Sequence, residues 1–249
     1  MTQQRSLKRV LVEGVVIVSS ILLAFSIDAW WDGVQDRSDE RLVLEALQVE
    51  FADNLEDLRA VHQVHVEYAA ELSQLVNLMA SVPDGRSIQV ADSLLRPLIS
   101  FRTADPAMGT LTTLLASGRI DLIRNQPLQQ ALAGWPAQLE DTAEDETLVR
   151  DFVHSQLISG LIGDIDLGPL LAAWSSLDPS GRTQRVDGQP INVGYPVGVS
   201  SSSRTLIGHR FHLSRLVVMQ SQDRLDTGAK ILSMIDRELD SVRARRPTL

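Results

Sequence analysis

One apolar stretch near the start of the chain, Val10 to Trp31, constrains the fold more than any other feature. Its sequence is VLVEGVVIVSSILLAFSIDAWW, and Gly14 to Ile27 contains no charged residue. A helix rises about 1.5 Å per residue, so these residues span roughly 33 Å, close to the thickness of one hydrocarbon core. The stretch therefore predicts a transmembrane anchor at 10–31, preceded by a short stub at 1–9.

The charges on either side of the anchor predict its orientation. Arg5, Lys8 and Arg9 precede its uncharged part, and the acidic residues Asp28, Asp32, Asp36, Asp39 and Glu40 lie among the residues that follow. Positive charge accumulates on the cytoplasmic side, and Trp favours the membrane–water boundary. We therefore expect a cytoplasmic N-terminus and an exported domain at 32–249. A signal peptide cleaved after Ser26 and a buried soluble helix are the alternatives to an uncleaved anchor.

Glu13 is the unusual residue of the anchor. It lies about six residues, or roughly 9 Å, from the midpoint near Ser19. Its carboxylate is therefore within reach of the cytoplasmic headgroups, and snorkelling is the simpler interpretation. The alternative is that an ionisable residue in a span contacts a partner helix. Ser20 and Ala24 form a small-xxx-small pair, a weak signal for helix pairing.

Composition bounds the exported part of the chain. The net charge of −9 argues against a nucleic-acid partner. Cysteine is absent, so the domain is held by its core without disulfides. Aromatic residues make up only 4%, and Leu and Ala are plentiful, which favours packed helices. We predict an all-α fold, with the transmembrane helix followed by an elongated bundle of three long and several short helices.

Apolar periodicity places the helices of this bundle. The strongest signal is a stripe from Leu44 to Met79 at intervals of three and four residues, in a run without Gly or Pro. Pro83-Asp84-Gly85 should end this helix as a turn. The expected helices are 38–80, 87–101, 105–117 with Gly118 as its cap, a brief one after Asn125, 135–162, a short one near 167–177, and 203–243 with Ser203 as its cap. We expect an irregular loop at about 178–203, with a small hairpin around 191–199.

Two histidine pairs are the best candidates for a metal site. His62 and His65 share one helix face by their spacing, and so do His209 and His212. If the first and last long helices run antiparallel and the last returns to the membrane, both pairs would lie at similar heights. Imidazole binds zinc, copper or nickel. The simpler interpretation is ordinary half-buried histidines, so we expect no metal and no cofactor.

Enzyme motifs are missing. The sequence has no Cys nucleophile, no Gly-x-Ser-x-Gly elbow, no phosphate-binding Gly loop and no His-Glu-x-x-His zinc motif. The acids between Glu140 and Glu146 are explained by a solvated helix start. We therefore predict no catalytic activity, with an enzyme of unrecognised type as an alternative.

Two segments resemble an uncharacterised group of bacterial single-pass membrane proteins. They are IDAWWDGVQDRSDERLVLEALQVEFADNLEDL, where an Asp-x-Trp element leads into an acidic helix, and LLASGRIDLIRNQPLQQALAGW. The resemblance covers the first 60 residues and roughly 104–146, and it is weak across 163–205. It implies an inner-membrane anchor and a helical periplasmic domain, and it supplies no activity and no site.

These observations favour a membrane-anchored interaction or sensing module, an accessory subunit of an envelope complex. The expected partners are the lipid bilayer and another membrane protein, or a second copy of the chain, contacted through the anchor helix at Glu13. The alternative is a periplasmic metal-binding protein that uses the four paired histidines. The stub at 1–9 is too short to carry an output domain.

Overall fold

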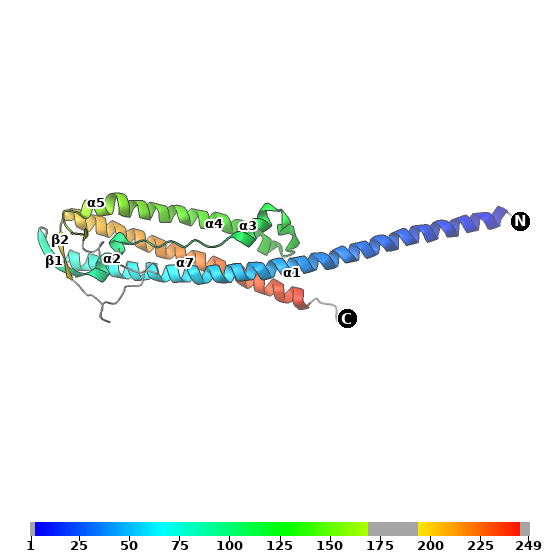
Figure 1. The fold of residues 1–249 in the computed structure, drawn as a ribbon, viewed down its shortest axis with the longest axis horizontal. Helices are drawn as coiled ribbons and strands as arrows, with labels where there is room; N and C mark the ends of the chain where they lie inside the picture. Colours follow the sequence, from blue (N-terminus) through cyan, green and yellow to red (C-terminus); the bar gives the residue numbers. More distant parts are fainter. Residues whose placement is uncertain (1–2, 169–193, 245–249) are drawn as a thin grey trace. The chain divides into compact units, whose positions relative to one another are not determined.

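The computed structural model describes residues 3–168 and 194–244, and these residues are predominantly helical (Figure 1). Within this part of the chain, the only strands are two short ones. The predicted all-α class is therefore confirmed. The chain divides into two compact units. Unit 1 comprises residues up to 50, 108–133 and from 231 onward, and unit 2 comprises 51–107 and 134–230.

Helix α1 is a single helix from Gln3 to Ala80, 78 residues long. The predicted helix at 38–80 is confirmed, and it is continuous with the predicted anchor segment, because Asp32 and Gly33 are helical. Near its N-terminus, α1 contains an 18-residue stretch of mean hydropathy 1.4, none of it buried in the structure. This stretch is long and apolar enough to be a candidate membrane span. The predicted stripe from Leu44 to Met79 is buried.

Unit 1 packs short elements against the first part of α1. These are α3 (Gly109–Ala116), the 3₁₀ helix η1 (Arg119–Leu122), the start of α4 (Gln126–Asp151) and the end of α7 (Ser201–Ala244). Gly118 has φ +68°, which confirms it as the left-handed residue that ends α3. Asn125 caps α4 as predicted, because its Oδ1 accepts the amide of Leu128 at 3.1 Å. The buried apolar residues of this unit are Leu44, Leu47, Leu111, Leu114, Ile123, Leu128, Leu132, Ile231, Ile235 and Leu239.

The predicted start of α3 at Asp105-Pro106 is wrong, since the helix begins at Gly109. The reason lies in a side chain on α1. In unit 2, the carboxamide of Asn54 donates to the carbonyl of Ala107 at 2.6 Å and accepts its amide at 2.8 Å. These two bonds satisfy the backbone of Ala107 in a non-helical conformation, so helix formation is delayed beyond it.

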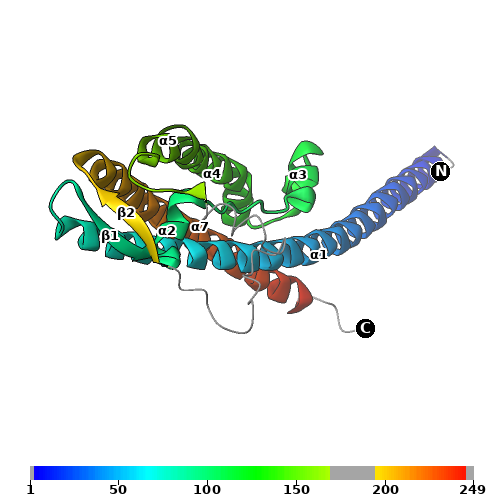
Figure 2. The same cartoon turned by 60° about the vertical axis from the view of Figure 1, so that its left-hand side comes forward.

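Unit 2 contains a two-stranded antiparallel sheet that the sequence analysis missed. β1 (Arg86–Ala91) pairs with β2 (Gly194–Val199), with Arg86 opposite Val199 and Ala91 opposite Gly194 (Figure 2). The helix predicted at 87–101 is therefore wrong over its first residues, and only α2 (Asp92–Ile99) is helical. In RSIQVA, Ile88 and Val90 alternate with polar residues, a β pattern.

The predicted loop at 178–203 is only partly within the described residues. Its last part contains the strand β2, so the strand structure expected around 191–199 is present at 194–199. The expected hairpin is wrong there, because these six residues form one continuous strand that pairs with β1. The remainder of that loop, and the short helix predicted near 167–177 beyond Gly168, lie outside the described residues.

The predicted break before Trp135-Pro136 is also wrong, because α4 runs through both residues. The indole of Trp135 is buried in unit 2, with its ring centroid 5.8 Å from that of Phe51. Proline inside a helix costs about 3 kcal/mol, whereas losing a buried Trp side chain costs about 3–5 kcal/mol. Burial therefore outweighs the missing hydrogen bond. Beyond Asp151 the chain stays helical through the π-helix η2 (Phe152–Leu157) and α5 (Ile158–Leu161).

Helix α7 begins two residues earlier than predicted, and its cap is Ser200 instead of Ser203. The hydroxyl of Ser200 accepts the amide of Ser203 at 3.0 Å, and the hydroxyl of Ser203 accepts the amide of Ser200 at 2.9 Å. This reciprocal pair is a capping box built from two serines. The consecutive serines 200–203 offer several equivalent caps, so the sequence alone does not select one.

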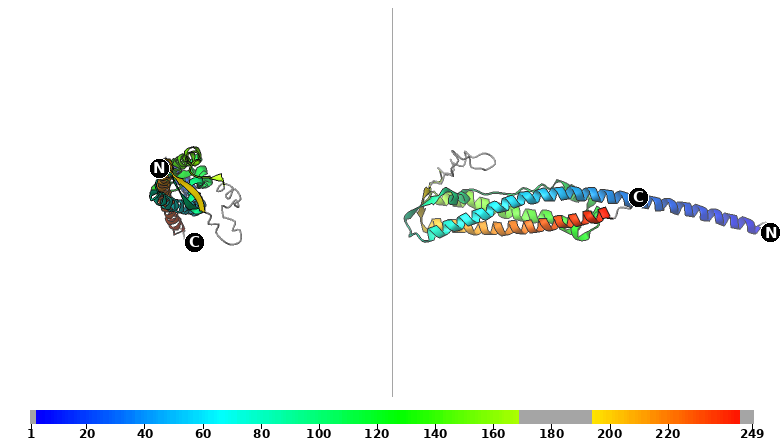
Figure 3. Two further views of the ribbon diagram at one scale, coloured as in Figure 1. Left: turned by 90° about the vertical axis from the view of Figure 1, so that its left-hand side faces the viewer. Right: turned by 90° about the horizontal axis from the view of Figure 1, so that it is seen from below.

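Helices α1 and α7 run antiparallel and side by side in unit 2 (Figure 3). His62 Nδ1 lies 2.7 Å from Ser221 Oγ, and Arg204 Nε donates to the carbonyl of Met79 at 3.2 Å. Gly228 provides the close approach between them. A Cβ built at this glycine would lie 3.0 Å from Leu55 Cδ2 and 3.3 Å from the Trp135 ring. The buried cluster of the unit consists of Leu72, Leu75, Met79, Val90, Leu95, Leu98, Phe152, Val153, Leu157, Leu161, Ile165, Leu167, Val197, Val199 and Ile207.

Candidate functional site

The outer face of α1 in unit 1 is the candidate functional surface. Leu44 and Leu47 are fully buried, whereas Leu42 is 55% exposed and Val49 is 60% exposed. At about 100° per residue, Leu42 and Val49 lie within roughly 20° of each other on the helix and opposite the buried pair. These two large aliphatic side chains form an apolar feature on one outward face of the helix, and folding does not bury it.

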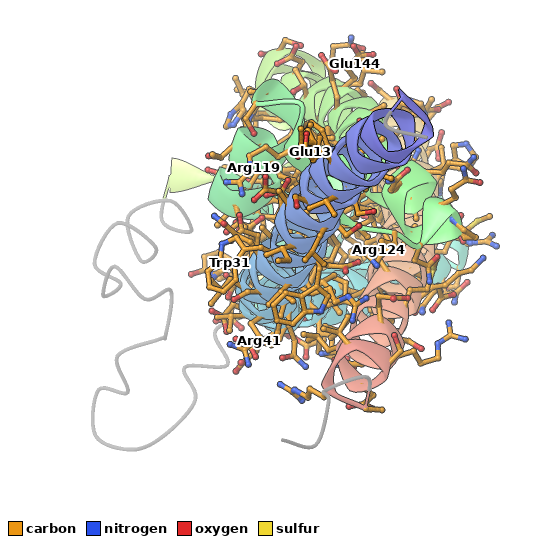
Figure 4. The ribbon with its side chains drawn as sticks, turned by 90° about the vertical axis from the view of Figure 1, so that its right-hand side faces the viewer. Glu13, Trp31, Arg41, Arg119, Arg124 and Glu144 are labelled. Carbon is orange, nitrogen blue, oxygen red and sulfur yellow. The ribbon has the colours of Figure 1, made fainter. Side chains whose placement is uncertain are left out.

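The same face continues into the candidate membrane span. By the same helical period, Glu13, Ser20, Ala24 and Trp31 fall within roughly 20° of Val49 around the axis. We call these residues, together with Leu42 and Val49, the outer stripe. Glu13 is exposed, and Trp31 is 62% exposed (Figure 4). The Ser20 hydroxyl donates to the carbonyl of Val16 at 2.7 Å, so it is satisfied within its own helix. The small side chain at this position therefore remains suited to close helix contact.

Carboxylates on the inner side of α1 hold the short helices of unit 1 in place. Glu50 accepts the amides of Thr110 at 2.6 Å and Leu111 at 3.1 Å, so α1 supplies the N-terminal cap of α3. Glu40 is 2% exposed and accepts the amide of Arg124 at 2.9 Å. These carboxylates fix the 108–133 segment against the part of α1 that follows the candidate span.

A hollow lies between α1 and this segment. It has a volume of about 260 Å³ and is lined by Asp36, Gly118, Arg119, Asp121, Leu122 and Arg124. Arg119 Nη2 pairs with Asp39 Oδ2 at 2.8 Å, and Arg124 Nε lies 3.8 Å from Glu40 Oε2. Both guanidinium groups are about half exposed (Figure 4). We call this site, defined by its six lining residues, the juxtamembrane hollow.

The structure does not bring the two histidine pairs together. His62 is level with Ser221 on the antiparallel α7, whereas His209 lies 12 residues before Ser221 in α7, or about 18 Å away along the axis at 1.5 Å per residue. His65 is buried, and His209 and His212 are exposed with ring centroids 6.5 Å apart. Among residues 3–168 and 194–244, no group of three or more His, Asp or Glu side chains is placed to hold a metal ion.

The interior of unit 2 contains polar groups that the sequence analysis missed. Arg210 is fully buried, and its guanidinium donates to the carbonyl of Pro97 at 3.1 Å and to Ser214 Oγ at 2.6 Å. Burial lowers the pKa of Arg210 to about 10. Arg224 is buried with Glu146, at an Nη2 to Oε1 distance of 2.7 Å. The spacings between the buried polar residues Arg210, Ser214, Ser221 and Arg224 are four, seven and three residues. This is the helical period, so the sequence carries a signal for them.

His65 is the titratable group most affected by this interior. It is 2% exposed, with its ring centroid 5.4 Å from that of Phe101. Burial lowers its pKa from 6.5 to about 4, and the cations Arg210 and Arg224 act in the same direction, while a backbone hydrogen bond at Arg102 opposes them. His65 is therefore neutral near pH 7. Burial likewise raises the pKa of Glu71, against the opposing charge of Arg96.

Comparisons with protein-family models, with curated proteins and with solved structures found no match.

Proposed function

We propose that the chain is a membrane-anchored helical interaction or sensing module, an accessory subunit of an envelope complex with no catalytic activity of its own. In this proposal α1 crosses the bacterial inner membrane once, with residues 1–9 in the cytoplasm and the domain in the periplasm. Membership of the uncharacterised single-pass group that the first 60 residues resemble is part of the same proposal.

The observation that carries the proposal is the outer stripe on a continuous helix. In unit 1, α1 passes from the candidate span to the buried residues Leu44 and Leu47 without a break. A helix without a flexible joint transmits rotation or displacement of the anchor directly to the packed residues. The exposed Leu42 and Val49 continue the same helix face beyond the candidate span, and in this proposal a partner covers them.

The continuity of the stripe specifies the partner's form. A partner that covers both the Ser20–Ala24 region and Leu42 must itself span the bilayer and continue out of it as a helix. At the depth of Glu13, such a helix would be expected to carry a cation or a hydrogen-bond donor, because charged groups in a span pair with one another. Between these two groups of contacts lies Trp31, and at its depth both helices would leave the hydrocarbon layer.

Co-purification in mild detergent tests the proposal. Wild-type protein with an affinity tag should retain a membrane partner, and Glu13→Leu or the double variant Leu42→Gln/Val49→Gln should lose most of it. The matched control is Val66→Gln, which changes an exposed valine of α1 outside the outer stripe. A protein that purifies alone in every form, or one whose partner is lost equally from the Val66→Gln control, contradicts the proposal.

A further inference from the structure

The juxtamembrane hollow carries opposite charges that are only partly paired with one another within the described residues. Its two cations are each held from one side, Arg119 by Asp39 and Arg124 by Glu40. Its two rim carboxylates, Asp36 and Asp121, make no ion pair with any of the described residues 3–168 and 194–244. The hollow therefore presents two guanidinium groups with spare N–H donors beside two carboxylates without a cation.

The size of the hollow restricts its ligand. Pockets for drug-sized molecules have volumes of about 300–1,000 Å³. The hollow, at about 260 Å³, is smaller than this range, so it suits a group of a few heavy atoms. The charge pattern requires that this group have both an anion and a cation with N–H donors, placed a short chain apart.

The height of the hollow along α1 indicates where such a group is found. Asp36 lies five residues after Trp31, or about 7.5 Å along the axis. The polar layer of a bilayer extends about 5–7 Å beyond the hydrocarbon on each side. If Trp31 marks the hydrocarbon boundary, the hollow opens at the outer edge of the headgroup layer. Arg119 and Arg124 have side chains long enough to extend toward it.

We propose that the juxtamembrane hollow binds the phosphoethanolamine headgroup of a membrane phospholipid. The phosphate accepts hydrogen bonds from the guanidinium groups of Arg119 and Arg124, and the ammonium group donates to the carboxylates of Asp36 and Asp121. The amine distinguishes this lipid from the others. A choline headgroup has no N–H donor, and a glycerol headgroup has no cation.

This inference rests on the membrane anchor of the proposed function, but it does not depend on a protein partner. A bound lipid would fix the rotation of α1 at the membrane surface through the segment that Glu40 and Glu50 hold. The outer stripe would then be presented to a partner at one angle. Lipid retention and partner retention are measured separately, so one can fail while the other holds.

The test uses the full-length protein reconstituted in vesicles of equal parts phosphatidylethanolamine, phosphatidylglycerol and phosphatidylcholine. After extraction in mild detergent, the retained lipids are quantified by mass spectrometry. Exposed ion pairs contribute about 0.2–1 kcal/mol each, so the two pairs that the ammonium group makes predict a roughly two- to thirtyfold enrichment of phosphatidylethanolamine. Asp121→Asn should return the composition toward that of the vesicle. Arg119→Gln removes a contact to the phosphate that all three lipids share, so it should lower the total amount of retained lipid.

The matched control is Asp105→Asn, which removes one exposed carboxylate that does not line the hollow. It should retain the wild-type lipid ratio, and soluble phosphoethanolamine at millimolar concentration should displace the lipid from wild type. Retained lipid of vesicle composition, enrichment of phosphatidylglycerol, or an equal loss in Asp105→Asn would each overturn the inference. If the protein fails to enter vesicles at all, the anchor itself is wrong, and the proposed function fails with it.

Discussion

Acidification should destabilise unit 2 through His65, and the size of the effect follows from its burial. The pKa of His65 is about 4 in the folded chain and about 6.5 when the ring is solvated. Between these pH values the unfolded chain binds a proton that the folded chain does not, so stability falls as pH decreases from 6.5 to 4. A tenfold change in a protonation constant is worth about 1.4 kcal/mol, so the total loss is about 3 kcal/mol.

The physical cause is the environment of the ring. Its Nε2 atom has no hydrogen-bond partner among the described residues, and Arg210 and Arg224 disfavour a further positive charge. His65→Phe should keep the ring contacts with Tyr68 and Phe101 and abolish this titration. We expect the free energy of unfolding of wild type, measured by chemical denaturation in detergent, to fall relative to that of His65→Phe by about 3 kcal/mol between pH 7 and pH 4.

The comparison with the variant is necessary because other groups titrate in the same range. Glu71, whose pKa is raised by burial, contributes with the opposite sign, since its folded form takes up a proton first on acidification. Its contribution is common to both proteins and cancels in the difference. An unchanged difference in unfolding free energy across this pH range would refute the assignment of a buried neutral His65.

Three further predictions test the packing. Gly208→Ala should raise the free energy of unfolding by about 0.5–1 kcal/mol through helix propensity, because a Cβ at this position has no atom within 4 Å. Gly228→Ala should instead lower the free energy of unfolding by about 1–3 kcal/mol, because its Cβ would lie 3.0 Å from Leu55 Cδ2. A gain at both glycines would contradict the close approach of α1 and α7. Glu50→Ala removes the cap of α3 and should cost about 1–2 kcal/mol, detected as faster amide exchange at Thr110 and Leu111; unchanged exchange would be evidence against the cap. Arg224→Met should lower the free energy of unfolding by about 3–5 kcal/mol, because it leaves Glu146 buried and unpaired. Adding Glu146→Leu should recover most of this loss. If the effects of the two substitutions simply add in the double variant, the ion pair between Arg224 and Glu146 is contradicted.

What the sequence predicts well in this chain is local and apolar. The stripe from Leu44 to Met79 repeats at the helical period without Gly or Pro, so nothing competes with a helix, and all of it is buried. The turn at Gly85 and the cap at Gly118 follow from positive φ angles that other residues rarely adopt. Each of these features depends on residues within one or two helical turns.

The features that the sequence did not predict depend on distant partners. β1 is stabilised by a strand more than 100 residues later, and a six-residue apolar alternation is ambiguous until that strand is known. Pro136 lacks a backbone N–H and favours a break in the helix, yet α4 continues through it and the indole of Trp135 is buried. The histidine pairs were aligned by counting residues from the membrane, whereas the register of α1 and α7 is set by contacts such as that of His62 with Ser221.

In the candidate site, too, local features can be predicted from the sequence and features that depend on distant residues cannot. Glu13 and Trp31 stand out in the sequence because charge and indole rings are unusual in an apolar run. The exposure of Leu42 and Val49 cannot be recognised in the sequence, because aliphatic residues are frequent along α1 and only packing decides which of them are buried. The juxtamembrane hollow needs Arg119 beside Asp36, residues 83 positions apart in the chain, and no local pattern relates them.

The central claim is that α1 is an uncleaved anchor that leaves the membrane as the first helix of a periplasmic domain. The chain has no cysteine, so single cysteines can be introduced at Ser6 and, separately, at the exposed Glu56 without background. Intact spheroplasts are treated with a membrane-impermeant maleimide, and each full-length protein is recovered from the membrane fraction. We expect labelling at Glu56→Cys and protection of Ser6→Cys until the membrane is opened. Labelling at Ser6→Cys in intact spheroplasts, or a mature chain lacking residues 1–26, would contradict it.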